Sequence, residues 1–307
     1  MKKEYTLSQQ FALISLDGLS CNHRSAAKYA ALRGIAAAKL LEEILLGRED
    51  MPAVQEFQTE LEAGIAAIKN RKKKEMDAVE RETADLLLAD GGIEIVPDLL
   101  GCDMNYYTAG ISMKSYRSDR EVYLSIVESV RAEILEEGPI TMECACLFWL
   151  IRESGCIHDI CSVKEQEKIQ VRMTALCGEE ELTDADYIGM IWRQEFHRSG
   201  EHMIKSFLKG KRELFKNPYL EGVNLLFPFL DRRQAIFVDF VIFGTTVKDR
   251  RWAMMEFLSE RGHFVEETKN GNETLLRIDN AYYRVWPKTV RSYKIPIQGA
   301  SLLPVYW

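Results

Sequence analysis

Apolar residues recur every three or four positions over most of the first 208 residues, a spacing that predicts amphipathic α-helices. A first helix is expected to begin after Thr6 and to end at Asp17–Gly18. A second is expected from about Ser25 to Leu46. Its many small residues would let neighbouring backbones approach closely, so we expect it at the centre of a bundle. Further helices are expected at about 52–89 (one long helix or a pair), 122–134, 141–153, 163–176 and 183–208.

The pattern changes to short apolar or alternating runs in two places. After the glycines at 91–92, the segment 90–97 predicts a short strand or hairpin. Near Asp231 the hydrophobic pattern changes again: the run at 235–243 predicts a buried strand, and the run at 247–261 predicts a helix. Turns at Asn270–Gly271 and Asp279–Asn280 then separate three more strands.

The expected fold class is therefore mainly α with a small α+β part. A helical bundle with a β-hairpin comes first, followed by a C-terminal β-α-β-β-β unit. We divide the chain into a helical domain at 1–230 and a small α+β domain at 231–307, in which 295–307 forms a further strand or a packed tail.

The charge is distributed unevenly between these two parts. The chain has a formal net charge of −7, but 247–307 holds ten Lys/Arg and seven Asp/Glu, a net of +3, so the remainder carries about −10. An acidic body argues against bulk nucleic-acid binding, while a local anion site remains compatible with it.

The cysteines and the N-terminus bear on the compartment. Seven cysteines, an odd number, favour reduced thiols in a cytoplasmic compartment. The first ten residues contain lysines without a following apolar segment, which is unlike a signal peptide. Apolar runs are too short for a spanning helix, so we expect a protein that is not inserted in a membrane.

A Cys/His cluster is the strongest candidate for metal or thiol chemistry. It comprises Cys144, Cys146, Cys156, His158 and Cys161. Residues two apart on a helix point to different faces and the spacing matches no standard zinc motif, so we favour buried thiols.

Other motifs for catalysis or cofactors are also weak. Glu195, His197, Glu201 and His202 lack the spacing that places two imidazoles on one helical turn, and glycine-rich phosphate loops are missing. We therefore expect no catalytic residue, no metal and no cofactor.

Two groups of cations remain. The run at 69–74 is interpreted as an exposed helix face, with contact to anionic lipid or nucleic acid as the alternative. The tail carries a cationic and aromatic set that either stacks bases or, as we favour, forms a half-buried sheet face: Arg277, Tyr282, Tyr283, Arg284, Trp286, Lys288, Arg291 and Tyr293.

Residues 5–110 resemble the Golgi phosphoprotein 3 family. The similar segments are Thr6-Leu-Ser-Gln-Gln-Phe-Ala-Leu-Ile-Ser-Leu-Asp-Gly18, Ala31-Leu-Arg-Gly34 with 40–48, and the glycine turn at 90–96. The resemblance implies a helical bundle with a β-hairpin and, in eukaryotic members, a basic pocket for a phosphoinositide headgroup. Arg33 carries over to that pocket. Arg24 and its neighbours stand where the family has a tryptophan, and Arg117 and Arg120 are stand-ins for the other arginines.

The expected function is a non-enzymatic peripheral adaptor that recognises an anionic, phosphoinositide-like headgroup. The anion-binding set would be Arg33, Arg24, Arg117 and Arg120. Expected partners are an anionic membrane surface and a second copy of the chain. The alternative is a nucleic-acid-associated or regulatory protein that uses the basic C-terminal unit, and a Cys/His enzyme is a third hypothesis.

Overall fold

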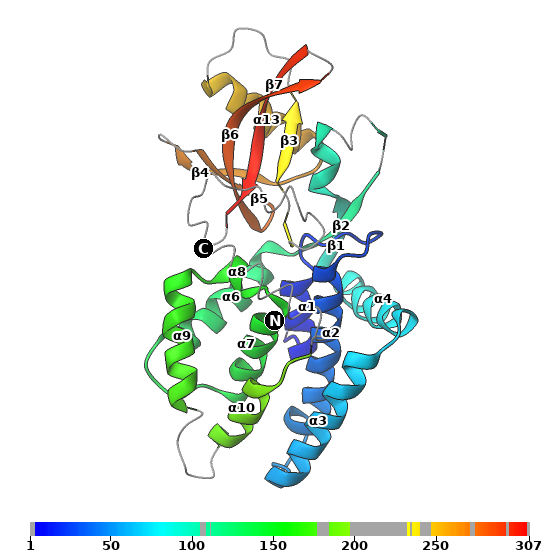
Figure 1. Cartoon of the computed structure of the whole chain (residues 1–307), viewed down its shortest axis with the longest axis vertical. Helices are drawn as coiled ribbons and strands as arrows, with labels where there is room; N and C mark the ends of the chain where they lie inside the picture. Colours follow the sequence, from blue (N-terminus) through cyan, green and yellow to red (C-terminus); the bar gives the residue numbers. More distant parts are fainter. Residues whose placement is uncertain are drawn as a thin grey trace.

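A computed structural model gives the arrangement of most of the chain. It describes residues 4–104, 109–110, 112–176, 184–196, 232–233, 235–239, 247–270, 274–292 and 295–305. The helices form a body in the lower part of Figure 1, and a C-terminal sheet stands above it. The fold is thus mainly α with a small β part, as the hydrophobic pattern predicted.

The first two helices begin at polar caps. Helix α1 spans Leu7–Ser15, and the backbone N–H of Thr6 donates to Gln9 Oε1 at 3.0 Å. Helix α2 spans Ala26–Leu41 and continues as a π-helical segment, η1, at Glu42–Leu46. The hydroxyl of Ser25 accepts a hydrogen bond from the backbone N–H of Lys28 at 3.1 Å, which satisfies one of the free donors of the first turn.

The remaining helices of the body agree with the predicted periodicity. Residues 52–89 form a pair of helices that separate at Arg71–Lys72, and the side chains at 71–74 are exposed as expected. The sequence pattern missed the short helix α8. The last predicted helix, 183–208, is wrong beyond Arg193, because residues 194–196 are not helical; 197–208 lie outside the described part. The helices are α3 Val54–Asn70, α4 Lys73–Ala89, α6 Arg120–Leu135, α7 Met142–Ser154, α8 Ile157–Ile160, α9 Val163–Leu176 and α10 Asp184–Arg193.

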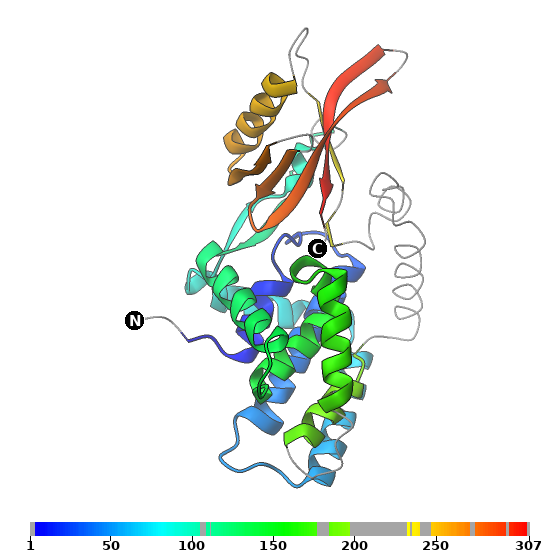
Figure 2. The same ribbon diagram turned by 90° about the vertical axis from the view of Figure 1, so that its left-hand side faces the viewer.

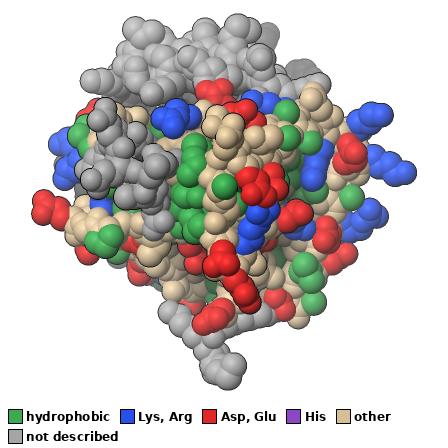
Figure 3. All heavy atoms as spheres, turned by 90° about the horizontal axis from the view of Figure 1, so that it is seen from below, with side chains coloured by type: hydrophobic (Ala, Val, Ile, Leu, Met, Phe, Trp, Pro, Cys, Tyr) green, Lys and Arg blue, Asp and Glu red, His purple; other side chains and the backbone are tan. Residues whose placement is uncertain are grey.

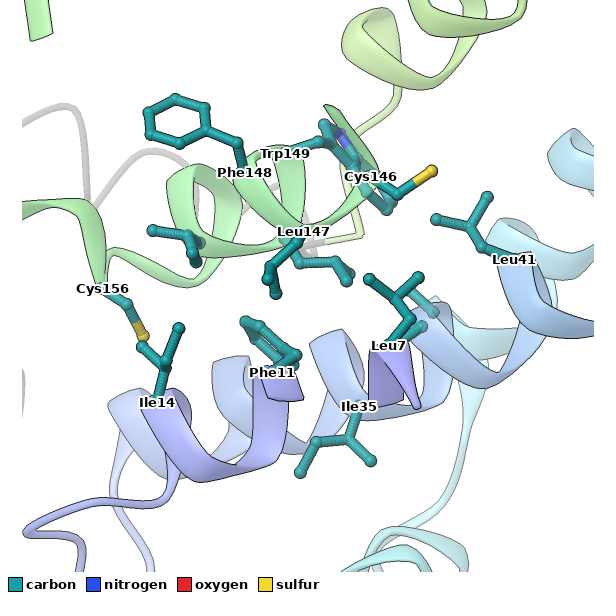
Figure 4. Packing of buried hydrophobic residues seen from close by; sticks show 14 of the residues in the cluster. Leu7, Phe11, Ile14, Ile35, Leu41, Cys146, Leu147, Phe148, Trp149 and Cys156 are labelled. Atoms are coloured by element: carbon teal, nitrogen blue, oxygen red, sulfur yellow. The ribbon is translucent and has the colours of Figure 1, made fainter. Parts of the chain in front are cut away.

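The core of the body lies where α1, α2 and α7 meet (Figure 4). Phe11 and Trp149 are completely buried there. A Cβ atom on Gly34 would lie only 2.4 Å from the ring of Phe11, so α2 passes α1 at a distance that only glycine allows. The small residues of α2 therefore serve the close packing that the sequence predicted.

A two-stranded antiparallel hairpin connects the body to the sheet above it. Strand β1 (Ile93–Pro97) pairs with β2 (Lys114–Ser118), and the 3-10 helix η2 (Leu99–Cys102) lies between them. The loop between α1 and α2 joins this hairpin, because Gly18 N–H donates to Tyr116 O at 2.8 Å and Tyr116 N–H donates to Leu19 O at 3.0 Å. The α1–α2 loop is thereby held at the top of the body.

The C-terminal unit is an antiparallel sheet of order β3-β7-β6-β5-β4. Helix α13 covers one face of this sheet (Figure 2). The predicted turn at 279–280 joins β5 to β6, and the segment after 295 is a strand. Of the strand expected at 235–243, residues 236–239 are described as such. The elements are β3 Ile236–Asp239, α13 Val247–Glu260, β4 Val265–Asn270, β5 Thr274–Ile278, β6 Ala281–Ser292 and β7 Ile295–Pro304.

The sheet has its own hydrophobic cluster, separate from that of the body. Met254 and Leu258 of α13 pack against Leu276 and Leu302 of the sheet, and Cys102 of the hairpin region joins them. The end of the body that faces away from the sheet presents many Asp and Glu side chains interspersed with Lys and Arg (Figure 3). None of the described helices combines the length and the apolar character needed to cross a bilayer.

Candidate functional site

A cavity of about 140 Å³ lies between the top of the helical body and the C-terminal sheet. Three parts of the body contribute to its wall: the α1–α2 loop, β1 with η2, and β2. The turn between β5 and β6 and the segment before β3 complete it. The Asp, His and Arg residues in its lining are Asp17, His23, Arg24, Asp98, Arg117, Arg232, Arg233 and Asp279.

A buried network of charges forms one wall of the cavity. Asp159, at the end of α8, accepts from Arg232 Nε at 2.7 Å and from Arg233 Nε at 3.4 Å. Arg233 also lies 3.5 Å from Asp17 Oδ2. Side chains of these four residues are all less than 10 % exposed, and a charge so buried is tolerated only when it is paired and hydrogen-bonded.

The network also binds the backbone at the end of α1. Arg232 Nη1 donates to Ser15 O at 2.8 Å, which satisfies a carbonyl that the helix leaves free. Asp17 Oδ1 accepts from the N–H of Ser118 at 3.0 Å and from Asn280 Nδ2 at 2.9 Å. Helix α1, strand β2 and the β5–β6 turn therefore meet at one carboxylate.

Arg117 connects β1, β2 and the C-terminal unit. Its Nε donates to Glu94 at 2.8 Å, and its Nη1 donates to Asp279 at 2.9 Å and to Gly262 O at 2.7 Å. Asp279, which has a positive φ of 54°, also contacts His263 Nδ1 at 2.8 Å. Among the described residues these contacts use only Nε and Nη1 of Arg117, so its Nη2 donors remain for a ligand.

Burial and pairing set the charge state of the cavity's carboxyl groups. Desolvation raises the pKa of Asp17 even though Arg233 opposes it, and desolvation raises the pKa of Asp98 in the same way. The pKa of Asp279 lies below its ordinary value, because contacts with His263, Phe264 N–H and Arg117 outweigh its desolvation. Four arginines thus line the cavity beside three carboxyl groups, two of which ionise less readily than usual. The further partners of these arginines, Asp77, Glu94 and Asp159, lie outside the lining.

Arg24 lies at the start of α2, beside the helix N-terminus. Its guanidinium is 41 % exposed and pairs with Asp77 Oδ2 at 2.7 Å, and Asp77 is 40 % exposed. Exposed ion pairs contribute little free energy, so a ligand can replace Asp77 at small cost. The partial positive charge of the helix N-terminus also favours an anion at this position.

The four arginines selected from the sequence do not form one site. Arg24 and Arg117 line the same cavity. Arg33 is buried in the middle of α2 and does not line it. Arg120, at the start of α6, pairs with Glu266 of β4 at 2.6 Å and also lies outside the lining.

The cysteine cluster lies in the hydrophobic core. Cys144, Cys146, Cys156 and Cys161 are all buried there. Burial raises the pKa of Cys144 to about 12 and that of Cys161 to about 11, which keeps both thiols protonated and unreactive. No group of His, Cys, Asp and Glu suited to a metal ion occurs in the described part of the chain. Residues 197, 201 and 202 lie outside the described part.

Most residues that build the cavity wall were missed in the sequence analysis. Asp17 was seen only as a helix stop, and Asp279 and Asn280 only as a turn. Arg232–Arg233, two adjacent cations before an apolar strand, were a usable signal, because such charges are rarely placed beside a buried strand unless they have partners. No feature of the sequence around Asp159 indicated that it would pair with these arginines.

The chain has also been compared with known proteins. No protein-family model, no curated protein and no solved structure matches it.

Proposed function

We propose that this protein is a non-enzymatic binding protein whose cavity takes the phosphate group of an anionic, phosphoinositide-like lipid headgroup. The observation that carries the proposal is that Arg24 and Arg117, on different elements, line one small cavity beside the N-terminus of α2. Charge-assisted hydrogen bonds from guanidinium groups to phosphate are among the stronger polar contacts in proteins.

The size of the cavity and the arginines in its lining support a small anionic group. A volume of about 140 Å³ corresponds to roughly four or five water molecules. A phosphate suits this space better than a large organic ligand. The two carboxyl groups with raised pKa, Asp17 and Asp98, ionise less readily than usual and so would oppose an anion less.

The way the site is built supports an adaptor role. The cavity is bounded by both the helical body and the C-terminal sheet, so an occupied site would stabilise their contact. Arg24 is the most exposed of its two proposed ligand-binding arginines and would meet the headgroup first. Recognition of this kind needs only preorganised donors and no chemical step.

Vesicle co-sedimentation tests the proposal. The full chain should bind phosphatidylcholine vesicles that contain a phosphoinositide and should not bind pure phosphatidylcholine vesicles. Arg24→Ala should weaken binding roughly five- to tenfold, because one charge-assisted contact is lost. Asp77→Ala should preserve or strengthen binding, since it releases Arg24 from its partner.

Arg48→Ala is the matched control. Arg48 is also an arginine in an ion pair, with Glu60 of α3 at 2.8 Å, but it does not line the cavity. Competition by soluble inositol phosphate separates binding of the headgroup from general attraction to a charged surface. Equal binding by Arg24→Ala and the parent protein would refute the proposal.

A further inference from the structure

The β6–β7 hairpin extends beyond the rest of the C-terminal sheet. Strand β5 pairs with β6 only as far as Val285, and β3 pairs with β7 between Gly299 and Leu302. Among the described residues, β6 pairs only with β7 from Trp286 onward, and β7 pairs only with β6 before Gly299. Beyond Lys288 the two strands therefore form a ribbon that projects from the described sheet. Figures 1 and 2 show this ribbon at the end of the molecule away from the body.

The strands of this ribbon belong to a purely cationic segment. Residues 281–307 contain four cations and not a single Asp or Glu: Arg284, Lys288, Arg291 and Lys294. The chain outside 247–307 is acidic, with a net charge of about −10, the difference between −7 and +3. A segment of one sign on a molecule of the other sign is a local site for an anionic partner.

Side chains on β6 alternate between two faces. Tyr283 is buried with Leu276 and Leu302 in the cluster beneath α13, and Val285 packs against that cluster. Tyr282, Arg284, Trp286 and Lys288 therefore share the opposite face. Trp286 is 41 % exposed and Lys288 is exposed.

The order of side chains on that face is aromatic, cation, aromatic, cation. Successive members, from Tyr282 through Arg284 and Trp286 to Lys288, lie roughly 7 Å apart, twice the rise per residue of a strand. Arg277 of β5 adds a further cation opposite Tyr282, with its guanidinium 5.7 Å from the centre of that ring. Arg277 is buried, and its Nε has no hydrogen-bond partner among the described residues.

We propose that this face of β6, with Arg277 beside it, binds single-stranded nucleic acid. An unpaired strand offers bases and phosphates in alternation, and the face offers rings and cations in alternation. Aromatic side chains stack on bases whatever their identity, and cations beside them contact the phosphates. Binding would accordingly depend little on sequence and strongly on salt.

The same features distinguish this partner from other polyanions. A duplex keeps its base faces stacked inside, so Trp286 would add nothing to its binding. An anionic membrane would be attracted by the cations alone, with no need for rings between them at strand spacing. The contribution of the Trp286 π-face is therefore the decisive measurement.

Fluorescence anisotropy with a labelled 20-nucleotide single strand of mixed sequence, titrated with the full chain, provides the test. Trp286→Ala should weaken binding on the order of tenfold, the loss expected for one stacked base. Trp286→Phe should retain most of the affinity, and Trp286→Leu should behave like Trp286→Ala, because only the phenyl ring keeps a π-face. Lys288→Gln should weaken binding several-fold and reduce the dependence of log K on log salt by about 0.7.

Two matched controls lie on other surfaces. Trp252 of α13 is 65 % exposed, and Lys168 of α9 is exposed. Trp252→Ala and Lys168→Gln should leave binding unchanged. Circular dichroism melts of each variant establish that the fold is intact.

Three results would each overturn the proposal. The first is no binding of the single strand in 50 mM salt. The second is equal binding of the single strand and of its duplex, with Trp286→Ala indistinguishable from the parent protein. The third is an oligonucleotide that binds no tighter than a polyglutamate of equal charge, while anionic vesicles bind the parent protein and Trp286→Ala equally well, which would assign the face to a membrane.

Discussion

The core of the helical body and the charged network above it are both buried, but they are held together by different forces. Around Phe11, Gly34 and Trp149 the interior is apolar and close-packed, and its stability comes from the area removed from water. Around Asp159, Arg232 and Arg233 the interior is polar, and each group depends on particular partners at particular distances.

This difference determines what each region tolerates. An apolar core accepts another side chain of similar volume with modest loss. A buried charge network does not accept the loss of one member, because the remaining charges are left without compensation. The core therefore secures the stability of the body, and the network determines how the C-terminal unit meets it.

The largest expected effect comes from removing the carboxylate shared by two arginines. Asp159→Ala leaves Arg232 and Arg233 buried without their common partner and should lower the free energy of unfolding by about 3–5 kcal/mol. Urea denaturation measures the loss. The triple variant Asp159→Leu/Arg232→Met/Arg233→Leu should recover much of it, and a loss below about 1 kcal/mol in the single variant would contradict a tightly desolvated network.

A cavity in the apolar core should have an effect of similar or slightly smaller size. Phe11 is completely buried against Gly34, so Phe11→Ala removes many contacts and should cost about 3–4 kcal/mol. Phe11→Leu should cost about 1 kcal/mol because more of the volume is kept. Equal losses in the two variants would show that volume is not what matters at this position.

The pH dependence of stability should differ between two carboxyl groups at the junction of the helical body and the C-terminal sheet, Asp279 and Asp17. The pKa of Asp279 is lowered by folding, so its contribution is present above its ordinary pKa and is lost as the pH falls through the folded value. The pKa of Asp17 is raised by folding, so its contribution decreases as the pH rises from its ordinary pKa through the raised folded value.

Asp279→Asn should therefore destabilise the protein at pH 7 by about 1–3 kcal/mol, the cost of weakened hydrogen bonds to charged groups, and by less at pH 3. At pH 7, Asp17→Asn should lower the free energy of unfolding by less than Asp279→Asn does. Thermal melts between pH 3 and pH 7 provide the measurement. If the stability of the parent protein and of Asp279→Asn changed with pH in the same way, the lowered pKa of Asp279 would be contradicted.

The smallest effect is expected at the rim of the same junction. Arg120 and Glu266 connect α6 to β4 at 2.6 Å, but their side chains are 47 % and 53 % exposed. Arg120→Ala should change the free energy of unfolding by less than about 1 kcal/mol, and salt should reduce that change further. A loss comparable to that of Asp159→Ala would show that burial does not explain the difference between the two pairs.

The sequence predicted the regions that depend on local pattern. Caps at Thr6 and Ser25 and the turn at Asp279–Asn280 follow from short-range rules, while the pattern over 52–89 left open whether one helix or two form there. Strand β2 was not predicted, because Lys114–Ser118 is largely polar and becomes a strand by pairing with β1. Its formation depends on tertiary contacts that local propensity does not contain.

The candidate site was harder to predict for the same reason. Arg24 and Arg117 were selected and do line one cavity, whereas Arg33 and Arg120 do not. Asp159 and Arg232 are separated by 73 residues, and Asp17 and Arg233 by 216. Nothing in the local sequence around Asp17 or Asp159 indicates an arginine so distant.

These long separations have a consequence for the newly synthesised chain. The ribosome releases Asp17, and later Asp159, well before Arg232 and Arg233 have been made. Until that pair arrives, a helical body that folds early holds two carboxyl groups in a site that disfavours their charge, so they stay protonated or the top of the body stays open to water. The arrival of two adjacent arginines then closes the top of the body, which makes the completion of its fold a late event in translation.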